Sequence, residues 1–367
     1  MKMSALLENL LAMCEEFQAS DLHLSTGLAP RFRIRGALVA AGDFRPFDAE
    51  TVDALTMELG LFTLPLGSPD GTEKIRMTLI KDGALDGALT SPSGTRYRFN
   101  LYRESDRHAI ALRRLDAKFY SFADLGLPKR LPKFCSENDG LVIVTGPTGS
   151  GKSTTLATMI DTINHTRDGH IITIEDPIEF VHKTDRCIVN QRQVGRDTRS
   201  FNDALIEAMR QDPDVILVGE IRELTTIRTA LRAAETGHLV LTTLHAGDCA
   251  GAIERLISVF PADEQNSARR QLALVLRGIF AQHLLASPDG SRHPACELLV
   301  NNTACANLIA TGRTSQLYSI IETGANLGMR TLDQSLTELF ANGLIDMRTA
   351  LTLSKNPELL KGRLVKC

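Results

Sequence analysis

Hydrophobic side chains in the first 115 residues change their spacing along the chain, and each spacing predicts a different element. From Leu6 to Phe17 they recur at intervals of three and four residues, which predicts an amphipathic helix over residues 4–17. Strict alternation over residues 31–35 predicts a strand that turns back at Gly36. The other elements predicted here are strands at 21–24, 37–39, 96–102 and 109–112, a helix at 48–61 and a weak strand at 76–80.

From residue 140 onward, short apolar runs alternate with helical patterns. Such alternation is typical of an α/β fold with a largely parallel central sheet. Residues 264–285 predict one long helix, and the tail predicts further helices, with Gly343 ending one and Asp346 capping the next. The predicted strands are 141–145, 170–174, 215–219 and 238–243, and the predicted helices between them are 152–164, 200–210 and 222–236.

These patterns predict an α/β protein with two domains and a tail. Residues 1–115 form an α+β domain with an antiparallel sheet, and the proline-containing residues 116–139 form a linker. Residues 140–290 form the α/β domain, and residues 291–367 form a mostly helical C-terminal region. A chain of 367 residues is long enough for this organisation.

Composition and charge narrow the class of protein. The chain is 43% hydrophobic and 23% charged, and its net charge of −3 argues against a sequence-wide attraction to nucleic acid or anionic lipid. No apolar run approaches the ~18–20 residues that cross a bilayer, and residues 1–17 lack the basic start of a signal peptide. We therefore expect a cytoplasmic protein without membrane insertion. The seven cysteines include no C-x-x-C pair, which predicts reduced and mostly buried thiols.

A phosphate-binding motif lies between the first strand and the first helix of the α/β domain, and it fits the pattern G-x-x-x-x-G-K-[ST]. Its glycines let backbone N–H groups turn inward around phosphate oxygens, and the helix N-terminus adds the positive end of its dipole. We expect Lys152 to reach the β- and γ-phosphates of ATP, and the Ser153 hydroxyl to ligate Mg²⁺. The predicted nucleotide-binding residues are Gly146, Pro147, Thr148, Gly149, Ser150, Gly151, Lys152, Ser153 and Thr154.

An ATPase also needs an acidic residue at the metal or at the attacking water. The apolar strand 215–219 ends in Glu220, and a buried strand would deliver this carboxylate to the ligand-facing edge of the sheet. Glu220 is therefore the candidate for orienting or deprotonating the water. The alternative is an ordinary glutamate at a helix start, just before Arg222.

Three further groups of polar residues have both a functional and a structural interpretation. The acidic segment 175–179 follows a strand at the edge where open α/β sheets bind ligands, but a solvated turn has the same spacing. His238 and His245 lie on either side of a strand. A histidine there can sense phosphate or metal, or it can be a hydrogen-bonded core or edge residue with no role in the site. Taken alone, the arginines of residues 98–114 are expected on a solvated sheet face. They are Arg98, Arg103, Arg107, Arg113 and Arg114.

Four sequence boxes resemble those of the type II/IV secretion ATPases, in the order and at the spacing of that family. Residues 145–154 are similar to its Walker A box, 174–180 to its Asp box, 212–222 to its Walker B box and 236–245 to its His box. Within that superfamily, further segments resemble the branch of type IV pilus retraction ATPases, so that the resemblance covers nearly the whole chain. These segments are 19–24, 259–262 and 327–333.

The resemblance implies a RecA-like P-loop ATPase core, an N-terminal PAS-like domain and a homo-hexameric ring. It implies that ATP and Mg²⁺ bind between subunits and that arginines of an N-terminal domain complete the site. Arg113 falls at one such family position, and Arg98 and Arg107 lie near others. The resemblance also gives site roles to further residues: Glu179, His238 and His245 join Glu220 as catalytic residues, and the metal ligands are Ser153, Glu179 and Glu220.

The function that the resemblance implies is a motor that couples ATP hydrolysis to pilus retraction and twitching motility. Its expected location is the cytoplasmic face of the inner membrane at the pilus base, with a platform protein and other pilus ATPases as partners. Two features set extension and type II secretion ATPases apart, a long N-terminal extension and a four-cysteine zinc insert, and neither occurs in this sequence. The family motif Ala-Ile-Arg-Asn-Leu-Ile reads Ala304-Cys305-Ala306-Asn307-Leu308-Ile309 here, without its arginine.

Three other functions remain open on the sequence. An ATPase of a secretion or conjugation apparatus would have the same core. A RecA-like nucleic-acid motor would need a basic channel with stacking aromatics, which a chain with no Trp and four Tyr does not favour. A non-catalytic nucleotide-binding regulator would bind ATP without hydrolysing it.

Overall fold

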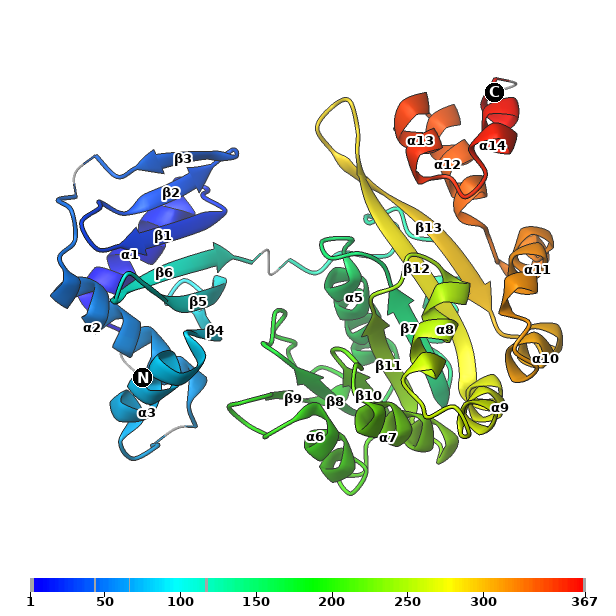
Figure 1. Cartoon of the computed structure of the whole chain (residues 1–367), viewed down its shortest axis with the longest axis horizontal. Helices are drawn as coiled ribbons and strands as arrows, with labels where there is room; N and C mark the ends of the chain where they lie inside the picture. Colours follow the sequence, from blue (N-terminus) through cyan, green and yellow to red (C-terminus); the bar gives the residue numbers. More distant parts are fainter. Residues whose placement is uncertain (1–2, 43, 66, 116–117, 366–367) are drawn as a thin grey trace. The chain divides into compact units, whose positions relative to one another are not determined.

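The computed structural model describes residues 3–42, 44–65, 67–115 and 118–365 (Figure 1). It divides into two compact units. Unit 1 consists of Met1–Lys118, Glu175–Val181 and Arg192–Ser200, and unit 2 consists of Phe119–Ile174, His182–Gln191 and Phe201–Cys367. Two residues of the expected linker, 116 and 117, lie outside the described residues. The predicted boundaries at 115, 139 and 290 stay predictions.

Unit 1 is built on a six-stranded antiparallel sheet in the order β3-β2-β1-β6-β5-β4. The hairpin predicted at Gly36 is present, the strands predicted at 96–102 and 109–112 pair with each other, and the helices predicted at 4–17 and 48–61 are confirmed. The strands are β1 (Asp21–Ser25), β2 (Arg31–Ile34), β3 (Ala37–Ala40), β4 (Ala84–Thr90), β5 (Arg96–Glu104) and β6 (Arg107–Arg114), and the helices are α1 (Ala5–Glu16), α2 (Ala49–Gly60), η1 (Leu61–Thr63) and α3 (Gly71–Asp82).

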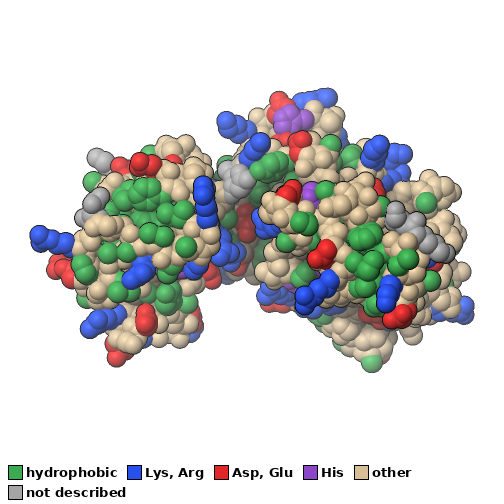
Figure 2. Space-filling model, turned by 90° about the horizontal axis from the view of Figure 1, so that it is seen from above, with side chains coloured by type: hydrophobic (Ala, Val, Ile, Leu, Met, Phe, Trp, Pro, Cys, Tyr) green, Lys and Arg blue, Asp and Glu red, His purple; other side chains and the backbone are tan. Residues whose placement is uncertain are grey.

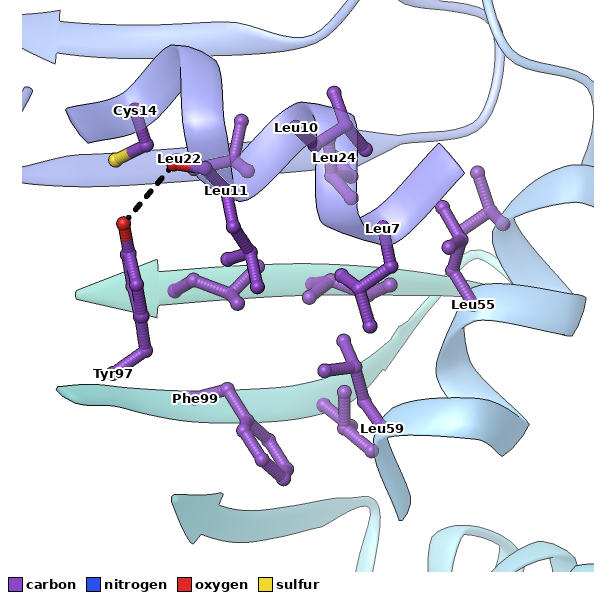
Figure 3. Close-up of a cluster of buried hydrophobic side chains, with 14 of the residues drawn as sticks. Leu7, Leu10, Leu11, Cys14, Leu22, Leu24, Leu55, Leu59, Tyr97 and Phe99 are labelled. Atoms are coloured by element: carbon purple, nitrogen blue, oxygen red, sulfur yellow. Dashed lines mark hydrogen bonds between the residues drawn. The ribbon is translucent and has the colours of Figure 1, made fainter. Parts of the chain in front are cut away.

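The core of unit 1 lies between α1 and the sheet (Figure 3). Leu7 and Leu11 are fully buried on one face of α1, because residues four apart lie on the same side of a helix. Tyr97 of β5 is also buried, and its hydroxyl donates a 3.2 Å hydrogen bond to the carbonyl of Leu11 (Figure 3). Helix and sheet are thus joined by both apolar packing and one buried polar contact.

The weak strand predicted at 76–80 is wrong, because these residues belong to α3. Ile75 and Leu79 are buried and stand four residues apart, so one turn of helix brings both into the core. Gly83 ends the helix with a φ of 77°, a left-handed conformation that glycine adopts without steric cost.

Unit 2 contains most of a seven-stranded sheet in the order β13-β12-β7-β11-β10-β8-β9, and the predicted α/β class is confirmed. The pairs β7–β11, β11–β10, β10–β8 and β12–β7 are parallel. The strands are β7 (Gly140–Thr145), β8 (Gly169–Glu175), β9 (Cys187–Gln193), β10 (Val215–Val218), β11 (Leu239–Leu244), β12 (Leu276–Ala286) and β13 (Arg292–Val300). The connecting helices include α4 (Leu131–Phe134), α5 (Lys152–Thr166), α6 (Phe201–Ala208), α7 (Leu224–Glu235), α8 (Cys249–Ser258) and α9 (Gln265–Val275).

The long helix predicted at 264–285 is wrong in its second half. The chain leaves α9 at Val275 and continues directly as β12, which pairs with β7 on one side and β13 on the other. Most of β12 is buried on both faces, so its apolar residues do not alternate. A continuous apolar run of this kind does not distinguish a strand from a helix by periodicity.

The C-terminal region begins with the strand β13. Helices follow it, and the predicted cap is confirmed, since the Asp346 carboxylate accepts from the N–H of Thr349 at 2.7 Å. Gly343 follows α12 with a φ of 69°. The helices are α10 (Thr303–Ala310), η2 (Thr314–Gln316), α11 (Leu317–Thr323), η3 (Ala325–Leu327), α12 (Leu332–Ala341), α13 (Met347–Leu353) and α14 (Pro357–Leu364).

The surface carries charges of both signs. On the face shown in Figure 2, Lys and Arg side chains are interspersed with Asp and Glu. Within the described part of the chain, no helix has the length and apolar character needed to cross a membrane.

Candidate nucleotide-binding site

The phosphate-binding motif follows one strand of unit 2, β7, and the Walker B and His boxes contain the neighbouring parallel strands β10 and β11. β7 lies beside β11, and β11 lies beside β10, all in parallel register. Parallel strands end at the same edge of their sheet, so Gly146, Glu220 and His245 lie at one edge. This is the edge at which open α/β sheets bind ligands.

The loop of residues 146–151 has a backbone that only glycine adopts easily at three positions. Gly146, Gly149 and Gly151 have φ values of 145°, 78° and 90°. A Cβ on Gly149 would meet nothing within 4 Å, and Pro147 and Thr148 are exposed, so the crest of the loop faces solvent. This conformation lets several peptide N–H groups converge on an anion.

Helix α5 begins directly behind this loop, with Gly151 as its N-cap. No side chain of the described residues caps it, so N–H groups of the first turn are left for another acceptor. The Lys152 ammonium donates to the carbonyls of Gly146 at 3.0 Å and Pro147 at 2.9 Å. The cation therefore lies over the loop, where it suits a phosphate group.

Glu220 is held at the end of β10 by its neighbours on β11. The hydroxyls of Thr242 and Thr243 donate to the carbonyls of Val218 at 2.8 Å and Gly219 at 2.6 Å. The Glu220 carboxylate lies 2.8 Å from the guanidinium of Arg222 and 3.8 Å from Nε2 of His245. The Glu220 carboxylate is thus held at this edge of the sheet. Its ion-pair partner Arg222 has a side chain that is 65% exposed and therefore has room to change its conformation.

His245 is close to both Lys152 and Glu220. Burial lowers the pKa of His245, the positive charge of Lys152 acts in the same direction, and Glu220 opposes them. The imidazole is therefore neutral near pH 7 and can accept or donate one hydrogen bond. Its backbone is fixed as well, since Arg255 donates to the His245 carbonyl at 2.9 Å.

Thr145 ties the His box to the phosphate-binding loop. The Thr145 hydroxyl donates to the carbonyl of Ala246 at 2.9 Å. The oxygen of this hydroxyl also accepts from the N–H of Ala246 at 2.9 Å. Because Thr145 immediately precedes Gly146, a movement of the His245–Ala246 segment is coupled to the start of the loop.

His238 lies away from this edge. It precedes β11, whereas His245 follows β11, so the strand separates the two by about 20 Å at ~3.3 Å per residue. Its Nδ1 is 3.0 Å from the carbonyl of Ala233 at the end of α7. Within the described chain the structure does not bring His238 to Lys152 and Glu220.

The Asp box and the arginines belong to unit 1, where the structure brings two of the predicted residues together. The Arg98 guanidinium lies 3.7 Å from the Glu179 carboxylate. The neighbouring Arg96 is 8% exposed, and its Nε and Nη2 donate to the carbonyl of Ile178 at 3.1 and 3.0 Å. Strand β5 therefore holds the segment that carries Glu179 by its backbone and by its side chain.

Arg113 and Arg107 occupy opposite ends of β6. Arg113 is paired in register with Arg98 across the β5–β6 ladder, and its Nε donates to Asp21 at 2.8 Å. Arg107 starts the strand opposite Glu104 and is exposed. The structure thus groups Arg98 and Arg113, while Arg107 lies six residues, or about 20 Å, along the strand.

The side-chain oxygen donors at this edge of the sheet suit Mg²⁺ bound together with ATP better than they suit a metal ion alone. Among the residues that the structure describes, no three or more His, Cys, Asp or Glu side chains form a group that could hold a metal ion. Mg²⁺ is commonly bound through one or two protein oxygens plus substrate phosphates. The exposed Ser153 and the half-buried Glu220 are oxygen donors at the edge where the phosphates would bind.

Comparisons with known proteins agree with this geometry. Residues 103–339 match the family model described as type II/IV secretion system protein. The chain is 42% identical to the type IV pilus retraction ATPase PilT of Pseudomonas aeruginosa, over 96% of this chain and 99% of that protein. It is 36% identical to the type IV pilus ATPase PilU of the same organism, over 94% of this chain and 87% of that protein.

A solved structure of the pilus retraction motor PilT with bound ADP superposes with a TM-score of 0.84 at 40% identity, covering 98% of this chain and 100% of that chain. The chain belongs to the type II/IV secretion system protein family of P-loop ATPases, and it is an ATP-hydrolysing enzyme. Within that family it groups with the type IV pilus retraction ATPases. The resemblance drawn from the four boxes is confirmed, whereas the PAS-like type of the N-terminal domain stays a prediction.

Two residues that contact the predicted site segments, Arg96 and Gln282, are not among the residues predicted from the sequence. Arg96 is the first residue of the alternating strand predicted at 96–102, and it is not among the predicted site residues. Gln282 was hidden by the helix predicted at 264–285. The signal for Gln282 was a single amide in the apolar run that follows Leu276, which is a position where a buried polar group needs dedicated partners.

Proposed function

We propose that this protein is the motor that couples ATP hydrolysis to retraction of a type IV pilus. The observation that carries the proposal is the edge of the unit 2 sheet, where the Lys152 ammonium lies over the phosphate-binding loop and the Glu220 carboxylate lies 3.8 Å from His245. Two of the relatives that span nearly the whole chain, PilT and PilU, are named as type IV pilus ATPases, which favours retraction over other uses of the same core.

In the proposed mechanism, the loop N–H groups and the α5 N-terminus bind the β- and γ-phosphates, and Lys152 neutralises their charge. Bound Mg²⁺ would add charge stabilisation of the phosphates, with Ser153, Glu220 and Glu179 as its expected ligands. Glu220 orients the attacking water and takes its proton. Neutral His245, which lies against Glu220, is suited to report by one hydrogen bond whether the γ-phosphate is present.

The working unit is proposed to be a homo-hexameric ring in which a neighbouring subunit completes each site. Unit 2 supplies the loop and the acid, but the positive charge for the transition state is still needed. Arg98 and Arg113 form a pair of exposed or half-buried cations on β5 and β6, and they are the candidates to supply it in trans. Arg107 lies at the other end of β6 from Arg113, and His238 lies at the other end of β11 from His245. Both are therefore weaker candidates for a catalytic role.

The proposed partners are the inner-membrane pilus platform protein and other pilus ATPases, and the proposed location is the cytoplasmic face of the inner membrane at the pilus base. Nucleic acid is not a proposed partner, because the chain has a net charge of −3 and, with no Trp and four Tyr, few aromatic side chains on which bases could stack. These partners and this location are what the resemblance to the pilus retraction ATPases implies, and they are expectations for this chain.

The experiment is a deletion of the gene in its native host, complemented with wild type or with Lys152→Ala. We expect the deletion strain to keep surface pili but lose twitching, wild type to restore it, and Lys152→Ala to fail at normal protein levels. Normal pilus retraction in the deletion strain would instead point to a related secretion or conjugation apparatus. Purified wild-type protein that binds ATP with Mg²⁺ but never hydrolyses it would indicate a regulator.

A further inference from the structure

Gln282 is a buried amide that contacts both sides of the phosphate-binding loop. It lies on β12, immediately after the residues paired with Val144 and Thr145 of β7, and it is 2% exposed. Its Nε2 donates to the carbonyl of Ser150, and its Oε1 accepts from the hydroxyl of Thr155 at 2.7 Å. One side chain therefore links the last part of the loop to the first turn of α5.

The loop also packs against the Gln282 residue itself. A Cβ on Gly146 would lie 2.2 Å from the Gln282 carbonyl oxygen, and a Cβ on Gly151 would lie 2.8 Å from its Nε2. Two glycines of the motif are thus required by closeness to Gln282 as well as by their φ values. The loop is therefore supported by packing against Gln282 and not only by its two ends at β7 and α5.

The contact to Ser150 fixes the direction of a peptide group. Ser150 is 2% exposed, so its carbonyl needs a donor from within the protein. In a trans peptide the carbonyl and the following N–H point in opposite directions. Binding the Ser150 carbonyl to Gln282 therefore turns the Gly151 N–H away from Gln282, which leaves that N–H free to bind an anion at the start of α5.

We propose that Gln282 is a positioning residue for nucleotide binding: it sets the Ser150–Gly151 peptide and the first turn of α5 before the phosphates arrive. This rests on the proposal that residues 146–154 bind the nucleotide. The chemistry requires an amide, because one atom must donate to a carbonyl while the other accepts from a hydroxyl. Methionine has a similar length and no hydrogen-bonding pair, and glutamate would bring a buried negative charge next to phosphates.

The test measures affinity for a fluorescent ADP analogue with Mg²⁺ together with the thermal midpoint of the nucleotide-free protein. Gln282→Met removes both hydrogen bonds with little change in volume. We expect the dissociation constant to rise about tenfold or more, since two hydrogen bonds that pre-organise the loop are lost. The matched control is Asn301→Leu, because the Asn301 amide donates to the carbonyls of Ala273 and Leu276 near the other end of β12.

Wild-type affinity in folded Gln282→Met protein would overturn the proposal. An equal loss of affinity in Asn301→Leu would also overturn it, because general loosening of the sheet would then explain the effect. If Gln282→Met does not fold, Thr155→Val removes only the hydroxyl contact, and we expect a two- to fivefold loss of affinity; no loss would again contradict the role. Lys152→Ala is measured in parallel, and unchanged affinity and turnover there would instead reject residues 146–154 as the site.

Discussion

The ammonium of Lys355 lies 3.0 Å from the carboxylate of Glu297, whose side chain is 2% exposed. The same ammonium lies 2.9 Å from Asp248, which caps α8 by accepting from the N–H of Gly251. Glu297 in turn accepts from the N–H of Cys249 at 2.9 Å. Lys355 stands between α13 and α14, so a partly buried ion cluster joins the C-terminal helices to the segment that follows the His box.

Removing this cation should destabilise the protein, because it leaves the Glu297 carboxylate buried without its positive partner. We expect Lys355→Met to lower the free energy of unfolding by about 2 kcal/mol, which is below the range for a fully buried pair because Lys355 is partly exposed. Lys361→Met, at an exposed lysine of α14, should change it by less than ~0.5 kcal/mol. Urea unfolding of each variant measures these differences.

A charge-specific effect can be separated from lost packing. Glu297→Gln removes the buried charge while keeping the side-chain shape, so it should suppress much of the loss when added to Lys355→Met. If the double variant is as unstable as the sum of the two single variants, the Lys355 contribution comes from its aliphatic stem.

The cluster should also give stability a defined dependence on pH. Burial alone would raise the pKa of Asp248, but the N–H of Gly251 and the Lys355 ammonium outweigh it and lower the pKa below 3.8. A carboxylate with a lowered pKa stabilises the fold above its unfolded value, and this contribution is lost as the pH falls through the folded value. The stability difference between wild type and Asp248→Asn should therefore be constant from about pH 5 to 8 and shrink below about pH 4.

At high pH the contribution of Lys355 to stability changes with pH in the opposite direction. Burial would lower the pKa of Lys355, but Glu297 and Asp248 outweigh burial and raise it above 10.5. Its contribution is full below the unfolded pKa and is lost as the pH rises through the folded pKa. A wild-type advantage over Lys355→Met that persists unchanged in strong alkali, while the protein remains folded, would contradict this account.

The secondary structure could be predicted where the spacing of hydrophobic residues was regular. The predictions were wrong where packing against other elements determines whether a segment is a helix or a strand. The alternating strands of unit 1 and the strand–helix alternation from β7 to β11 were predicted to within a few residues. The break from α9 into β12 was not, because β12 is covered on both faces and shows no alternation. α8 and β9 were not predicted at all.

The site shows the same division between local and long-range information. The loop, Glu220 and His245 were found because each follows a strand of the parallel sheet, and sequence order sets that edge. The pairing of Arg98 with Glu179 joins residues 81 positions apart, and sequence spacing carries no trace of it. The contact of Gln282 with Ser150 depends on β12 lying beside β7, which the helix assigned to that segment excluded.

Glu220→Gln should retain nucleotide and lose turnover. The amide keeps the shape of the carboxylate and can still contact Arg222, but it cannot take a proton from water. We expect kcat to fall by about 100-fold or more, with the ADP dissociation constant within about twofold of wild type. Arg222→Ala serves as the control, since it breaks the same ion pair and leaves the carboxylate. A collapse of ADP affinity with normal residual turnover in Glu220→Gln would assign this residue a structural role.

Arg113→Ala should lower turnover far more than nucleotide binding if Arg113 acts on the transition state of a neighbouring site. An arginine supplied in trans is commonly worth ~10³–10⁵ in rate. Arg113 also donates to Asp21, and although burial raises the pKa of Asp21, hydrogen bonds from Arg113 and Ser20 outweigh this and lower it. Asp21→Asn therefore removes the negative charge of this ion pair and keeps the arginine, and we expect it to retain most of the turnover.

Mixing Arg113→Ala with Lys152→Ala subunits separates an action in trans from one within the chain. In a ring of head-to-tail subunits, a site formed by the loop of an Arg113→Ala subunit and the arginine of a Lys152→Ala subunit is intact. Random mixing in equal amounts makes such a site at about a quarter of the interfaces, so a comparable fraction of wild-type ATPase activity should return. Each variant alone stays inactive. Mixed rings that remain inactive, in a preparation shown by labelled subunits to have exchanged, would place Arg113 in a structural role or in the site of its own chain.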